Sequence, residues 1–268
     1  MVKTNPVYRS GIIRYAWLCL LFILGFSVRL QAQGLLFQGN NKLISERTSY
    51  NVFQHSMPVF NNRFTLSFDL SILDTTSFGY VCFIKDNESE ASFSLTLSEK
   101  DHYVYLDFNI DSKQNLVQIP LKKSELGYRR WHRVTLNFLS DKNAIEIIVD
   151  GKSYTSFFKQ YKKQFSPVII FGKHDNVVDV PKIAIRQLVI RGEKKAFSFL
   201  FDEHDGNAVH DTKGSALGHV DNPVWLINES YHWKLRYTGS SKTVAAINFD
   251  NQQQRIIIAN KDSVVFFD

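Results

Sequence analysis

A segment with strict two-residue alternation, residues 63–72, constrains the fold of this chain more than any other feature. Its apolar side chains, which would share one face, are Phe64, Leu66, Phe68, Leu70 and Ile72. A period of two belongs to a β-strand that buries one face and keeps the other in water. Residues 91–97 and 103–110 repeat the pattern, and outside residues 1–32 no segment keeps the 3.6-residue period of a helix.

Further short apolar segments, separated by turn residues, extend this pattern along the chain. The strands expected from them span residues 131–139, 144–149, 152–158, 168–171 and 183–190. Asp150-Gly151, between two of these strands, is a strong signal for a tight hairpin turn. Many short alternating strands predict an all-β fold of antiparallel sheets, as in a sandwich or a barrel.

The charge of the chain is concentrated at its beginning. The formal net charge is +6, but residues 1–32 hold Lys3, Arg9, Arg14 and Arg29 and no acidic residue. The remaining sequence is close to neutral and its basic runs are short, so we expect solvated faces rather than a nucleic-acid surface. With 44% hydrophobic residues and 22 Phe, the chain has ample material for a core.

Residues 1–32 have the order of an export signal. A basic stretch precedes the apolar residues 15–28, and the small Ala32 follows where a signal peptidase would cut. The apolar run suits a signal peptide and is short for a membrane-spanning helix. We therefore expect cleavage after Ala32 and a periplasmic, cell-surface or secreted protein, with an uncleaved signal anchor as the alternative. Only Cys82 would then remain, in an apolar segment that predicts a buried, unreactive thiol.

Two neighbouring motifs resemble a known family. Residues 131–138 read Trp-His-Arg-Val-Thr-Leu-Asn-Phe, and residues 145–152 read Ile-Glu-Ile-Ile-Val-Asp-Gly-Lys. A strand ending in glycine, 168–172, and the strand 183–190 follow in order. Together they resemble the concanavalin A-like lectin and glucanase domains of the laminin-G type. The resemblance implies a two-sheet antiparallel jelly-roll sandwich, assigned to residues 33–200, but its motifs say little about a ligand.

Trp131 and His132 receive different expectations. A Trp at the start of a strand that continues with Val134, Leu136 and Phe138 is expected to anchor the core. The alternative is an exposed ring that stacks on a sugar. His132 is expected to point outward into solvent.

The sequence changes character after residue 200. Residues 201–221 are polar and rich in turn residues, which predicts a linker. Residues 222–268 are expected to form a β-meander with strands at 245–249, 255–259 and 263–267. This meander resembles the first blade of a kelch-type β-propeller, and one isolated blade would be unstable. The alternative is a tail that docks on the sandwich.

Catalytic patterns are missing from the sequence. Glycoside hydrolases share this sandwich, and retaining ones need two carboxylates about 5.5 Å apart. Glu203-His204-Asp205 has the first two acids of the laminarinase-like motif, but Ala208 stands at the third position. The single acids expected to be solvated on polar strand faces are Asp69, Asp107 and Glu146. A non-enzymatic protein is therefore expected, with a glycoside hydrolase as an alternative.

Calcium is the one cofactor that the resemblance implies, held by oxygen ligands at a loop rim. Asp86 and Asp175 are the candidate ligands, because each lies at the end of a predicted strand or in the loop after one and each precedes an Asn. The histidines and aspartates of residues 204–211 have a weak metal-binding spacing and are expected to belong to a plain linker.

Export, the resemblance and the missing acids together indicate a non-catalytic binding module for carbohydrate or another extracellular polymer. The alternative is a structural or sensory segment of a longer cell-surface receptor with a propeller. No nucleic-acid partner is expected. Membrane contact is expected only through the signal segment or through a C-terminal part beyond this sequence.

Overall fold

The computed structural model describes residues 34–226, except 56, 62, 89–90, 111–113, 128–129, 159–163, 176 and 204, together with the backbone of 244–245, 256–260 and 263–267. The predicted export signal, residues 1–32, lies outside the described residues. Within them, no helix has the length and apolar character needed to cross a membrane.

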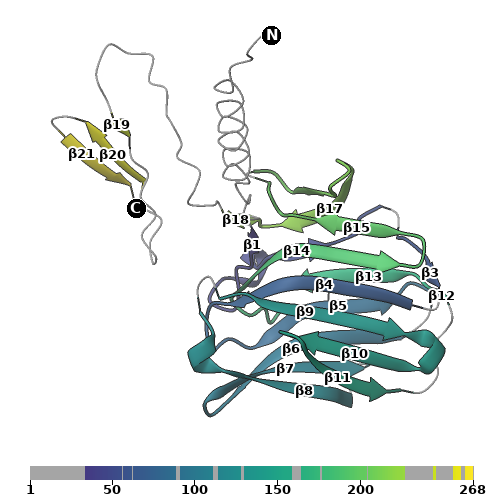
Figure 1. The fold of residues 1–268 in the computed structure, drawn as a ribbon. Coiled ribbons are helices and arrows are strands. Elements are labelled where there is room, and N and C mark those ends of the chain that lie inside the picture. Colours follow the sequence, from purple (N-terminus) through teal and green to yellow (C-terminus); the bar gives the residue numbers. More distant parts are fainter. Residues whose placement is uncertain are drawn as a thin grey trace, which may run out of the picture. The chain divides into compact units, whose positions relative to one another are not determined.

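One layer of the fold is a sheet with the strand order β11-β10-β9-β4-β14-β1-β18, in which β15 also pairs with the second half of β14 (Figure 1). Its strands are β1 (Gly34–Leu36), β4 (Arg63–Ile72), β9 (His132–Leu139), β10 (Ala144–Val149), β11 (Lys152–Phe157), β14 (Ile183–Gly192), β15 (Ala196–Phe199) and β18 (Val224–Leu226).

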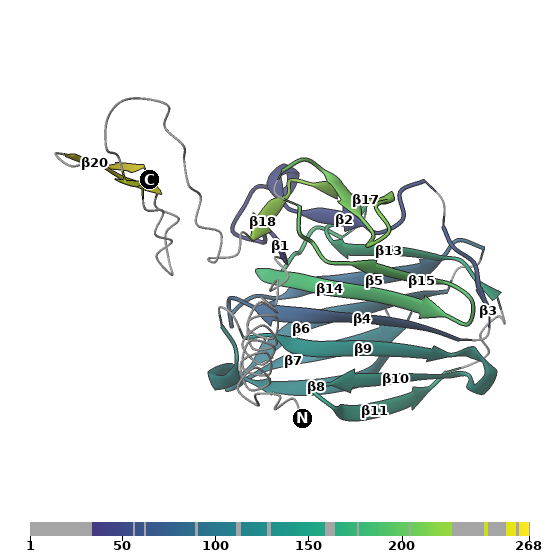
Figure 2. The same ribbon diagram turned by 45° about the horizontal axis from the view of Figure 1, so that its top comes forward.

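The opposite layer has the strand order β16-β17-β2-β13-β5-β6-β7-β8 (Figure 2). Its strands are β2 (Ser49–Asn51), β5 (Gly79–Asp86), β6 (Ser92–Lys100), β7 (Tyr103–Ile110), β8 (Gln114–Lys122), β13 (Pro167–Gly172), β16 (Ala208–His210) and β17 (Ala216–Asp221). A two-stranded ribbon joins β3 (Phe60–Asn61) to β12 (Gln164–Phe165), and the 3-10 turns are η1 (Ile44–Glu46), η2 (Lys123–Glu125) and η3 (Ser140–Lys142). The strands of each sheet pair antiparallel, which confirms the predicted jelly-roll sandwich.

The inner faces of the two sheets supply the hydrophobic core. The inward-facing side chains of β4, each at most 3% exposed, are Phe64, Leu66, Phe68, Leu70 and Ile72. Each such side chain stabilises the fold by about 1.5–3 kcal/mol relative to leaving it in water. Cys82 in β5 is buried as predicted, and burial raises the pKa of its thiol.

The sandwich extends past residue 200, so the predicted linker at 201–221 is wrong. β16 and β17 lie in this segment, and β17 pairs with β2 through Val220 and Tyr50. β18 continues the other sheet, where Trp225 pairs with Leu35 and its indole N–H donates to the carbonyl of Gly206 at 3.1 Å. β16 and β18 have three residues each, too few to show a period, and the turns between the strands make the segment polar.

The expectations for Trp131 and His132 are reversed in the structure. Trp131 is only partly buried, and the guanidinium of Arg186 lies 4.2 Å from its ring centroid. His132 is 8% exposed and shares the inner face of β9 with Val134. The core position therefore belongs to the histidine, and the tryptophan lies outside it.

The three strands predicted near the C-terminus are present as an antiparallel sheet of their own. They are β19 (Val244–Ala245), β20 (Ile256–Asn260) and β21 (Ser263–Phe267), in the order β19-β20-β21. Residues 222–226 belong to the sandwich instead, because they contain β18. The kelch-type blade stays a prediction.

Candidate functional site

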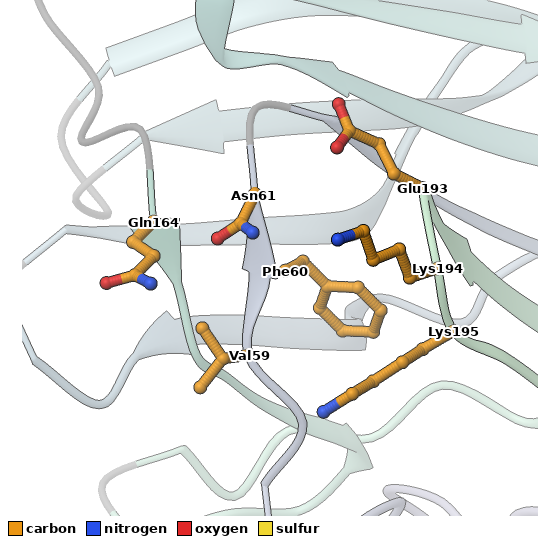
Figure 3. Close-up of a pocket in the computed structure, with 7 residues that line it drawn as sticks. All are labelled: Val59, Phe60, Asn61, Gln164, Glu193, Lys194 and Lys195. Atoms are coloured by element: carbon orange, nitrogen blue, oxygen red, sulfur yellow. The ribbon is translucent and has the colours of Figure 1, made fainter.

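A cavity of about 250 Å³ lies where the β3–β12 ribbon meets the turn between β14 and β15 (Figure 3). Three chain segments far apart in the sequence line it. The lining residues are Val59, Phe60, Asn61, Gln164, Glu193, Lys194 and Lys195. We refer to it as the ribbon pocket.

The apolar wall of the ribbon pocket is anchored in the core. Phe60 is 3% exposed and stacks on Phe64 with ring centroids 5.4 Å apart, and Phe64 in turn stacks on Phe138 at 4.3 Å. Aromatic pairs at these separations add about 0.5–1.5 kcal/mol to the burial of the rings. The position of β3 is thereby fixed against the sandwich.

The opposite wall is the β14–β15 turn, and it is held close to Phe60. A Cβ at Gly192 would lie 2.4 Å from Phe60 Cδ1, so this close approach requires glycine. The N–H of Gly192 donates to the carbonyl of Lys195 at 2.8 Å and closes the turn. The backbone of the turn that carries Lys194 and Lys195 is therefore fixed in position next to the pocket.

The polar side chains among the described lining residues are two amides, two ammonium groups and one carboxylate. Asn61 and Gln164 are register partners across the β3–β12 ribbon, so their amides come from adjacent strands. Figure 3 shows both lysine side chains extending from the turn toward β3, while the carboxylate of Glu193 points away from them. Amides donate and accept hydrogen bonds, whereas ammonium groups only donate.

The Glu193 carboxylate lies close to a different cation. The pKa of Arg63 is raised, first by its hydrogen bond to Asp141 and more weakly by the charge of Glu193. No ion pair or hydrogen bond ties the side chain of Lys194 or Lys195 within the described part of the chain. The ribbon pocket is therefore electropositive.

The predicted calcium ligands do not come together. Asp86 is 1% exposed, its Oδ1 accepts the N–H of Ser166 at 3.1 Å, and it pairs with Pro167 at the start of β13. Asp175 is exposed and follows Gly172 at the other end of β13, about 17 Å away at 3.3 Å per residue. Among the described residues, no three His, Cys, Asp or Glu side chains form a metal-binding group. Calcium at either residue alone stays a prediction.

Asp107, expected to be solvated, is instead 7% exposed and surrounded by donors. Its Oδ2 accepts the hydroxyl of Ser98 at 2.5 Å, and its Oδ1 accepts the amides of Gln118 at 2.8 Å and Asn115 at 3.2 Å. A carboxylate held by three donors is a structural element of the β6–β7–β8 face. The sequence predicted a solvated Asp107 because the side chains that donate to it lie on the neighbouring strands β6 and β8, which a pattern within β7 does not reveal.

The other two acids on strand faces are also engaged. Glu146 accepts Ser153 Oγ at 2.7 Å and Asn137 Nδ2 at 2.9 Å, and these hydrogen bonds hold its pKa below the usual range. Asp69 lies between two arginine side chains, at 2.9 and 3.0 Å. Neither carboxylate has a second acid as its partner in these contacts.

Two acids in residues 203–211, Glu203 and Asp211, hold backbone turns. Glu203 Oε1 accepts the backbone N–H of His210 at 2.8 Å. Asp211 Oδ1 accepts the N–H groups of Lys213 and Ser215 at 3.0 and 2.9 Å, which shapes the β16–β17 turn. His204 lies outside the described residues.

Comparison with known proteins shows the fold. No family model matches the sequence, and no curated protein matches it. Among solved structures, a heptameric SAP-like pentraxin from Limulus polyphemus aligns with a TM-score of 0.51 at 13% identity, over 74% of this chain and 96% of that chain. A proposed carbohydrate-binding protein from Bacteroides ovatus aligns with a TM-score of 0.50 at 13% identity, over 75% of this chain.

This fold is a concanavalin A-like sandwich. The chain spans 61% of the Bacteroides ovatus protein, which is less than two thirds of its length. Domains LG4-5 of the mouse laminin alpha1 chain also align, with a TM-score of 0.41 at 12% identity, over 72% of this chain and 47% of that chain.

Sequence reasoning missed the ribbon pocket. Its residues come from segments around 60, 164 and 194 that no local motif connects. The available signal was Glu193-Lys194-Lys195, a charged triplet in a turn directly after a predicted strand. Read alone, such a triplet indicates only a solvated loop.

Proposed function

We propose that this chain is a non-catalytic carbohydrate-binding module that works outside the cytoplasm, with the ribbon pocket as its sugar site. The observation that carries the proposal is the combination in one cavity of paired amides, two ammonium groups and an apolar wall. The sandwich fold, which this chain shares with a proposed carbohydrate-binding protein, supports it. The order of residues 1–32 supports export.

The chemistry of the pocket suits a sugar ring. Sugar hydroxyl groups both donate and accept hydrogen bonds. The amides of Asn61 and Gln164 can likewise donate hydrogen bonds to a hydroxyl group and accept them from it. Val59, which is 40% exposed, can contact the C–H side of a ring, and the buried Phe60 next to it holds the strand in place. The volume of about 250 Å³ falls below the roughly 300–1,000 Å³ of pockets for drug-sized ligands, which suits one ring at a chain end or branch.

The carboxylates support a binding role over hydrolysis. A glycosidase needs an acid and a second carboxylate on opposite sides of the scissile bond. Among the described residues that line the ribbon pocket, Glu193 is the one carboxylate, and its side chain points away from the lysines. Elsewhere, Asp69, Asp107 and Glu146 are held by cations or donors rather than by a second acid.

A glycan array tests the proposal. The wild-type chain is expected to bind at least one immobilised glycan, and the double variant Asn61→Ala/Gln164→Ala is expected to bind it about tenfold more weakly through loss of hydrogen bonds. Gln54→Ala, which removes an exposed amide outside the pocket, is the matched control. The proposal is wrong if no glycan binds, or if the bound glycan is turned over.

A further inference from the structure

We propose that the ribbon pocket selects an acidic sugar, one that carries a carboxylate or a sulfate group. This inference rests on the proposed function, because it names the class of glycan that the same site takes. It is carried by the electrostatics of Lys194 and Lys195 and by the way their turn is held.

The two lysines differ from Lys122 and Lys123, each of which has an acidic partner. Lys123 pairs with Glu99, and Lys122 lies 3.6 Å from Glu125. Lys194 and Lys195 have no such acidic partner among the described residues, although both line a cavity. Two neighbouring ammonium groups repel each other. An anion bound between them offsets this repulsion and is also attracted by both charges.

The acid in the same turn does not neutralise the pair. Glu193 is adjacent in sequence, yet its carboxylate points away from both ammonium groups (Figure 3). Its charge acts on Arg63, whose guanidinium also pairs with Asp141 through Nε at 3.1 Å. The local balance at the mouth of the pocket therefore stays positive.

The turn gives the two charges a defined place. The N–H of Gly192 closes it onto the carbonyl of Lys195, and the absence of a Cβ at Gly192 lets it lie against Phe60. The Cα of each lysine is thus fixed, while the flexible stem adapts to the ligand. Lysine serves as a point charge for carboxylates and sulfates and does not demand the fork geometry of arginine.

The amides distinguish an acidic sugar from a free anion. Asn61 and Gln164 offer donors and acceptors on the ribbon side of the cavity, opposite the turn with the lysines. A bare sulfate offers acceptors alone, whereas a uronic acid or sulfated sugar offers hydroxyl groups as well. The site therefore matches a ring that has hydroxyls on one side and a negative group on the other.

The test uses the full chain on an array of neutral, carboxylated and sulfated glycans that includes two matched pairs. Oligogalacturonate is compared with its methyl ester, and carrageenan oligosaccharides are compared with their desulfated forms. We expect binding to the acidic member of at least one pair and a loss of at least tenfold when the charge is removed. The pair that responds identifies the carboxylate or the sulfate as the group recognised.

Lysine variants test whether the preference for acidic glycans depends on the ribbon pocket. Lys194→Gln/Lys195→Gln is expected to lose about 10- to 30-fold in affinity, near fivefold per exposed charge, and wild-type binding is expected to weaken at 1 M NaCl. Lys152→Gln/Lys213→Gln removes the same net charge from exposed sites elsewhere and is expected to change affinity less than twofold. Equal binding within both pairs, or binding to neutral glycans alone, would overturn this inference and leave the proposed function standing. Binding to no glycan would overturn both.

Discussion

Nδ1 of His132 lies 2.6 Å from Oδ2 of Asp150, and the other oxygen of Asp150 accepts the backbone N–H of Arg133 at 2.8 Å. One carboxylate thus ties the tight turn after β10 to the first residues of β9. Because a carboxylate only accepts, the Nδ1 atom carries the proton and donates. The two motifs that resemble the laminin-G type meet in this contact.

Removing this carboxylate is expected to lower the free energy of unfolding by about 1–3 kcal/mol, since the buried imidazole loses its partner. Asp150 has φ 49°, so Asp150→Gly deletes the side chain without backbone strain. Chemical denaturation of Asp150→Gly, His132→Gln and the double variant measures the coupling. If the losses of the two single variants add up to the loss of the double variant, the contact between the two side chains contributes nothing to stability.

Trp131→Ala is expected to cost about 1–2 kcal/mol, less than the 3–5 kcal/mol of a fully buried Trp. The ring is only partly buried, and its contact with Arg186 is a cation–π interaction at a partly exposed site. Denaturation curves of Trp131→Ala give the value. A loss above 3 kcal/mol would place the ring in the core after all.

Two truncations test the corrected boundary. A chain that ends at Asp221 lacks β18 and the buried Trp225, whereas a chain that ends at Leu226 keeps both. The shorter chain is expected to be less stable by about 3–5 kcal/mol, or roughly 10 °C in Tm. Trp225→Ala in the longer chain should reproduce most of this loss. Equal Tm values for the two chains would show that residues 222–226 add nothing to the stability of the sandwich.

His174 is expected to make the sandwich less stable in mild acid. Burial lowers the pKa of its imidazole, which stacks on Phe83 with ring centroids 4.2 Å apart, and the nearby Asp175 only partly opposes this shift. The unfolded state then takes up a proton more readily, so stability is complete above about pH 6.5 and falls as pH drops toward the lowered pKa. His174→Phe keeps an aromatic ring and removes the titration. The free energy of unfolding of His174→Phe should fall less between pH 7.5 and 5 than that of the wild-type chain. If the two proteins lose stability equally over this range, His174 is not the cause of the loss.

Alternation in the sequence predicted most of the sandwich, because β4 and β9 bury one face along their whole length. The same alternation, counted back from Val134, reaches His132 and not Trp131. The error at Trp131 therefore came from giving residue type more weight than period. β16 and β18 could not be found this way, because three residues show no period and their partners are distant in the chain.

The ribbon pocket lay beyond the sequence for a related reason. Its two amide residues are neighbours because β12 pairs with β3, where Phe165 is the partner of Phe60, and its lysines come near because Gly192 lies against the Phe60 ring. Such contacts depend on how distant segments pack, which no local pattern encodes.

The most direct test of the binding account is an amide NMR titration of the isotope-labelled chain with oligogalacturonate and with a carrageenan oligosaccharide. For the glycan that binds, the account predicts the largest shifts at Asn61, Gln164, Lys194 and Lys195, including the side-chain amides of the first two. Shifts confined to the β6–β7–β8 face around Asp107, with the ribbon pocket unchanged, would contradict it.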